Sequence, residues 1–107
     1  MDFNRYQDLA RRTQNNELSQ AQKVHHALFG LASEVGEIHA IFQKFYQGHH
    51  IDTKELVNEA GDALWFLAEL CDWIGVGMDE VAEHNIEKLK KRYPNGFDED
   101  RSVHREV

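Results

Sequence analysis

The chain has 107 residues, of which 41% are hydrophobic and 29% charged, a composition typical of one ordinary globular domain. Its formal net charge of −7 argues against a nucleic-acid polymer as partner, because phosphate binding needs clustered lysine and arginine in excess. The single cysteine has no disulfide partner within the chain, and no apolar run approaches the ~20 residues that span a bilayer. We therefore expect a cytoplasmic protein without a membrane partner.

Helical periodicity runs through most of the chain, and no stretch alternates between apolar and polar residues as a strand does. Apolar side chains at helical intervals predict a first helix over about residues 2–13. A second, longer helix is predicted from Ser19, whose spacing to Gln22 fits a capping box, to Gly48. The sequence therefore predicts an all-α fold.

A third helix is predicted after the short link at residues 48–51, which should make it an antiparallel neighbour of the second helix. Asp52 and Glu55 repeat the capping-box spacing. The apolar stripe that follows includes Cys71, interpreted as a small buried hydrophobe, and ends at Ile74 before a Gly-Val-Gly turn.

A fourth helix is predicted to begin at Met78 or Asp79 and to end at Tyr93, because the proline that follows disfavours helix. The charged stretch 98–107 has no periodicity, and a frayed terminus is its simplest interpretation. We expect one domain over residues 1–97 and a polar tail over 98–107.

Two acidic pairs stand inside otherwise apolar helical stretches. Glu34 and Glu37 form one pair, and Glu59 and Asp62 form the other. Residues three apart share a helix face, and the two pairs lie at similar distances from the predicted hairpin turn, so the four carboxylates should converge. Converging carboxylates repel one another unless a cation binds, and Mg²⁺ prefers such ligands. A solvated acidic stripe on each helix is the alternative.

Each acidic pair encloses a glycine, Gly36 in the first and Gly61 in the second. Glycine inside a helix costs ~1 kcal/mol relative to alanine, which suggests close approach of backbone or ligand at these positions.

These residues resemble the MazG-like family of all-α nucleoside triphosphate pyrophosphohydrolases, whose signature is ExxE followed by ExxD on an adjacent helix. The signature lies in residues 30–37 and 58–65, and the resemblance continues through 85–97. It implies hydrolysis of a nucleoside triphosphate to the monophosphate and pyrophosphate. It also implies a four-helix bundle completed by oligomerisation into a homodimer or homotetramer. The metal ligands would be Glu34, Glu37, Glu59 and Asp62, with Mg²⁺ as cofactor and Mn²⁺ as an alternative.

Many relatives carry an additional acid before the first signature glutamate, but this chain has Ser33 there. We therefore expect Glu34 to be the general base. Lys88 and Arg92 share a face of the fourth helix and could bind phosphates as a point charge and a bidentate fork. The full set of expected substrate-binding residues is Lys44, Asn85, Lys88, Arg92 and Tyr93.

Two other functions stay open at this point. One is a non-catalytic helical module for nucleotide binding or oligomerisation, because Ser33 replaces the expected acid. The other is a phosphoribosyl-ATP pyrophosphohydrolase with the same fold. A ferritin-like di-metal site is disfavoured because the chain has no Glu-x-x-His motif. The aromatic side chains expected in the core or in a subunit interface are Phe29, Tyr46, Trp65, Phe66 and Trp73.

Overall fold

The computed structural model describes residues 1–105, and the all-α prediction is confirmed. The described residues contain no strand, only an isolated bridge between Pro94 and Gly96. The helices are α1 (Phe3–Ala10), a 3₁₀ turn η1 (Arg11–Thr13), α2 (Gln20–Tyr46), α3 (Thr53–Ile74), α4 (Met78–Arg92) and α5 (Glu99–Val103).

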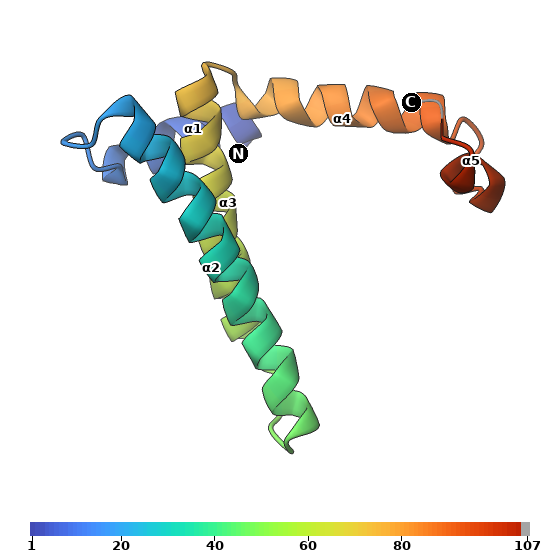
Figure 1. Ribbon diagram of the computed structural model, residues 1–107, viewed down its shortest axis with the longest axis horizontal. Helices are drawn as coiled ribbons and strands as arrows, with labels where there is room; N and C mark the ends of the chain where they lie inside the picture. Colours follow the sequence, from blue (N-terminus) through green and yellow to red (C-terminus); the bar gives the residue numbers. More distant parts are fainter. Residues whose placement is uncertain (106–107) are drawn as a thin grey trace.

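Helices α2 and α3 form a long antiparallel hairpin, as predicted from the short link between them (Figure 1). The predicted capping box of α2 is confirmed, since the Ser19 hydroxyl accepts from the Gln22 amide at 3.2 Å and the Gln22 side chain accepts from the Ser19 amide at 2.9 Å. The second predicted box is wrong in part. Asp52 does cap α3, but it accepts from the Lys54 amide at 2.9 Å, one residue earlier than a capping box requires.

The buried core lies where α1 crosses the carboxyl-terminal half of α3. Ala10, Ala68, Cys71 and Met78 form its buried cluster. The interpretation of Cys71 as a small buried hydrophobe is confirmed, since only 6% of it is exposed. Gly75 ends α3 in the left-handed conformation, with φ of 76°, and α4 starts three residues later at the predicted position. The core therefore joins α1, α3 and the first turn of α4.

Helix α4 extends away from the hairpin, so one chain does not close a bundle by itself (Figure 1). Within the described residues α4 packs mainly on α1. The stretch after Phe97 differs from the expected irregular tail, because Asp98 accepts from the amides of Asp100 and Arg101 and so caps the short helix α5. The sequence signal for this helix is a cap alone, without the apolar periodicity used to predict the others.

The chain is extended. Its radius of gyration is 17.0 Å, against about 13 Å for a compact domain of this length. Apolar side chains remain exposed along both hairpin helices, among them Leu28, Val35, Phe42 and Leu67. No helix among the described residues is long and apolar enough to cross a membrane.

Candidate active site

Three of the four signature acids converge on the facing sides of the hairpin. Glu34 comes from α2, and Glu59 and Asp62 come from α3, one turn apart. One carboxylate oxygen from each lies within 4.8 Å of the other two. The antiparallel register of the hairpin produces this convergence, because residues at similar distances from the 48–51 link lie side by side.

The pKa of the Glu34 carboxyl group is strongly raised. A hydrogen bond shared with Glu59 is the largest cause that raises the Glu34 pKa, followed by burial and by the charges of Glu59, Asp62 and Glu37. Together these effects bring the pKa from its ordinary 4.5 to about 7. A carboxyl group with this pKa exchanges its proton near neutral pH, which suits it to acid–base chemistry.

The three acids fit a divalent cation. The Oε2 atom of Glu34 is buried and has no hydrogen-bond partner within the described residues. Such an atom is costly to leave unsatisfied, and three carboxylate oxygens at this separation form a set of hard ligands that Mg²⁺ or Mn²⁺ could share. Glu34, Glu59 and Asp62 are therefore the residues that could hold the ion.

Glu37 does not join this group. Its carboxylate lies outside the three converging oxygens, although its charge contributes to the raised pKa of Glu34. Of the two explanations expected for the signature glycines, close approach of backbone is wrong, because a Cβ at Gly36 or Gly61 would have no neighbour within 4 Å. Close approach of a ligand stays a prediction. The close approach occurs instead at Gly30, where a Cβ would lie 2.1 Å from the Phe66 ring. The glycine that packs the hairpin stands one turn before Glu34.

The structure does not bring the expected substrate-binding residues to the acids within one chain. Lys44 lies in the last turn of α2, about 15 Å along the axis from Glu34. The other four belong to α4 or follow it directly, and α4 extends away from the hairpin (Figure 1). Asn85 lines an apolar pocket between α1, α3 and α4, and the Tyr93 ring lies 5.5 Å from that of Phe97.

A buried acid that we did not single out from the sequence lies two turns beyond Asp62. Glu69 is only 2% exposed, and its carboxylate pairs with His26 Nδ1 at 2.7 Å across the hairpin. The His26 ring contacts Trp65 and Phe66 edge-on. A charged residue inside the apolar run 63–71 was the available sequence signal.

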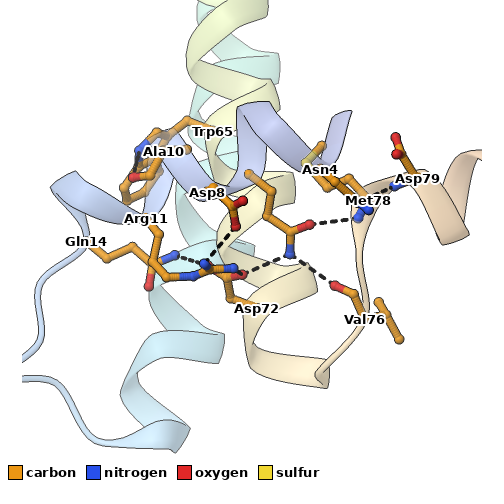
Figure 2. A network of polar contacts seen from close by, with 11 residues as sticks. Asn4, Asp8, Ala10, Arg11, Gln14, Trp65, Asp72, Val76, Met78 and Asp79 are labelled. Carbon is orange, nitrogen blue, oxygen red and sulfur yellow. Dashed lines mark hydrogen bonds and ion pairs between the residues drawn. The ribbon is translucent and has the colours of Figure 1, made fainter. Parts of the chain in front are cut away.

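The aromatic residues divide between core and surface. The Trp65 indole donates to the Ala10 carbonyl (Figure 2). It also donates to the Thr13 hydroxyl, so it attaches the end of α1 to α3. Phe66 packs on Gly30. Phe29, Tyr46 and Trp73 are exposed in the single chain, as residues of a subunit interface would be.

Comparison with known proteins identifies the family of this chain. No curated protein and no solved structure matches the chain. The family model described as "MazG nucleotide pyrophosphohydrolase domain" matches residues 22–97, which include both acidic pairs, all of α3 and all of α4. Since this match covers well over half of the sequence, the chain belongs to the MazG nucleotide pyrophosphohydrolase domain family.

Proposed function

We propose that this protein hydrolyses a nucleoside triphosphate to the nucleoside monophosphate and pyrophosphate, with Mg²⁺ as its cofactor. The observation that carries the proposal is the convergence of Glu34, Glu59 and Asp62 around a buried carboxylate oxygen that lacks a donor. Canonical and modified nucleotides, with ribose or deoxyribose, are the proposed substrate class. Family membership supports the nucleotide pyrophosphohydrolase activity.

The acids have different proposed roles. Glu34, Glu59 and Asp62 hold the ion, and Glu37 stands beside them and adds negative charge. A divalent cation, when bound, neutralises phosphate oxygens and lowers the pKa of an attacking water. Glu34 is the proposed general base, because one of its two carboxylate oxygens can accept a proton from the attacking water while the other holds the ion. Ser33 is exposed beside it and offers no carboxylate for that role.

The cations of α4 are proposed to bind the phosphates in an assembled site. Lys88 and Arg92 lie one turn apart on α4, with Asn85 and Tyr93 nearby and Lys44 on α2 as a further contact. Because α4 extends away from its own hairpin, these residues reach an acid cluster only if a second copy of the chain completes the site (Figure 1).

The exposed faces of the hairpin support pairing with a second copy. On α2 the apolar residues follow a heptad spacing of three and four, typical of helix-bundle seams. They are Val24, Leu28, Leu31, Val35, Ile38, Phe42 and Phe45. Several are about half exposed, including Leu28 at 47%, Val35 at 42% and Phe42 at 44%. The proposed assembly is a homodimer, or a homotetramer built from it, in which two hairpins form a four-helix bundle.

The exposed area agrees with this assembly. The chain exposes 8103 Å², whereas a compact monomer of this length exposes about 6,200 Å². The excess of about 1,900 Å² per chain is the size of an obligate dimer interface. Phe42→Glu should therefore give a monomer by light scattering. Gln43→Glu adds the same charge at the next, exposed position off the seam and should leave the dimer intact. Dimers in both variants would contradict this interface.

Activity is tested with canonical and modified nucleoside triphosphates and phosphoribosyl-ATP, each with Mg²⁺, by measuring pyrophosphate and orthophosphate separately. We expect pyrophosphate as the first product. Glu59→Gln should lower kcat/KM by about 10²-fold, while Glu55→Gln, one turn earlier and exposed, should change it little. Orthophosphate as the first product would contradict the proposed bond cleavage. Absence of turnover, with metal binding unchanged in Glu59→Gln, would support a non-catalytic nucleotide-binding module.

A further inference from the structure

The first turn of α4 is capped by side chains from the other end of the chain. The residue before the helix, Gly77, has no side chain to cap it. Instead the Met78 amide donates to Gln7 Oε1 at 2.7 Å, and the Asp79 amide donates to Asn4 Oδ1 at 3.0 Å (Figure 2). Both acceptors belong to α1, so α1 satisfies donors that a helix N-terminus otherwise leaves without partners.

Gln7 also binds the end of α3 and the link that follows it. Its Nε2 atom donates to Asp72 Oδ1 at 2.8 Å and to the Val76 carbonyl at 3.0 Å. Only 4% of Gln7 is exposed. Asp72 is held in turn by the Arg11 guanidinium, through contacts of 2.7 and 3.2 Å (Figure 2). One buried amide therefore joins α1, α3, the link and α4.

Besides these hydrogen bonds, the packing of Met78 in the core cluster holds the first turn of α4. Its main packing partner is α1, and the link to α3 contains Gly75 in the left-handed conformation with φ of 76°. Gly77 packs against the capping side chain itself, since a Cβ there would lie 2.7 Å from Asn4 Oδ1. The first turn therefore determines where the far end of the helix lies.

The length of α4 amplifies any change at its first turn. Lys88 follows Met78 by ten residues and Arg92 by fourteen, which is about 15 and 21 Å along a helix axis. A rotation of about 20° at the first turn would move these side chains by about 5 and 7 Å. Displacements of this size would remove a cation from hydrogen-bonding distance of a phosphate.

We propose that Gln7 and Asn4 are positioning residues, which set the direction of α4 and so place Lys88 and Arg92 for phosphate binding. The geometric part stands on the contacts above, and the phosphate part rests on the proposed function. Neither residue touches the acid cluster: Gln7 and Asn4 act at the α1–α4 junction, whereas the cluster lies on the α2–α3 hairpin. Changes at these residues should therefore alter substrate affinity and leave cation binding unchanged.

The direction of α4 is tested by double electron–electron resonance, which measures the distance between two spin labels. The labels are attached at Lys54→Cys and Lys91→Cys in a Cys71→Ala background. Labelled protein is diluted into unlabelled protein so that distances within one chain dominate. Gln7→Met keeps the side-chain length but removes all three hydrogen bonds, and it should shift and broaden the distance distribution. Arg5→Ala, an exposed change on the same helix, should not. An unchanged distribution in Gln7→Met would overturn the proposal.

The phosphate part is tested by steady-state kinetics on the same variants. Gln7→Met and Asn4→Ala should raise KM about tenfold, with kcat and Mn²⁺ affinity within about twofold of the wild type. Asn4→Asp keeps an acceptor for the Asp79 amide, so its KM should be that of the wild type rather than that of Asn4→Ala. This pair of Asn4 variants tests the same point if Gln7→Met does not fold. A shifted distance distribution with unchanged KM would overturn the placement of the cations. Absence of wild-type turnover would refute the proposed function instead and leave the distance result standing.

Discussion

The raised pKa of Glu34 makes cation binding depend on pH. In the metal-free protein the hydrogen bond shared with Glu59, burial and the neighbouring acids bring this pKa to about 7. A cation at Glu34, Glu59 and Asp62 must displace the proton that Glu34 carries below that pH. Cation binding should therefore be compared between pH 6 and pH 8, in the wild type and in Glu34→Gln.

The size of the effect follows from the pKa. Glu34 is ionised in about one molecule in eleven at pH 6 and in about ten in eleven at pH 8. The apparent affinity for the ion should accordingly be about tenfold weaker at pH 6 than at pH 8. At pH 7 the binding of one ion should release about half a proton.

Isothermal titration calorimetry with Mn²⁺ in buffers of different ionisation enthalpy measures both quantities. Glu34→Gln should bind more weakly, release no proton and show no pH dependence over this range. Because the folded-state pKa lies above the ordinary 4.5, the metal-free wild type should also lose stability as pH rises from 4.5 through 7, whereas Glu34→Gln should not. An affinity equal at pH 6 and pH 8 in the wild type would refute the electrostatic reasoning for this site.

Three further predictions concern assembly and stability. The first mixes Glu59→Gln with the double variant Lys88→Ala/Arg92→Ala and unfolds and refolds the two together. The mixture should recover about a quarter of wild-type activity if α4 completes the site on the hairpin of a second copy, and no activity if α4 completes the site on its own hairpin. Gly30→Ala should lower the free energy of unfolding by about 1–3 kcal/mol, because the new Cβ meets the Phe66 ring. Gly36→Ala, with open space around it, should raise the free energy of unfolding by up to ~1 kcal/mol. Equal effects of the two variants in thermal denaturation would contradict the packing of Phe66 on Gly30. Burial alone would raise the Asp72 pKa, but hydrogen bonds from Arg11, Gln7 and Gln14 outweigh it and hold that pKa below the ordinary 3.8. The stabilisation by Asp72 is thus present at neutral pH and lost as pH falls below 3.8. Asp72→Asn should therefore lower the free energy of unfolding by ~1–3 kcal/mol at pH 7 and by much less near pH 2. A loss of stability independent of pH would argue against an ionic role for Asp72.

Local signals in the sequence were sufficient for the helices. Apolar periodicity, the Ser19 cap and the glycines at 75 and 77 predicted α2, α3 and α4 closely, because each signal acts within a few residues of its own position. The α5 helix was missed because five residues with one capping aspartate carry too little periodicity.

The acid cluster was predictable for a related reason. A short link makes two helices antiparallel, and spacing from the link then aligns Glu34 with Glu59 and Asp62. Glu37 was included because it shares the sequence motif, but its carboxylate does not join the three that face one another across the hairpin.

What only the tertiary structure decided are the contacts between residues far apart in the chain. The buried pair of His26 and Glu69, the packing of Phe66 on Gly30, and the capping of α4 by Gln7 and Asn4 join positions 36 to 75 residues apart. Each depends on where one helix rests on another, and periodicity within a single helix contains no information about that placement. The sequence by itself determined helices α1 to α4, the hairpin and the position of Glu34 opposite Glu59 and Asp62. The tertiary structure decided the direction of α4, because that direction is set by α1.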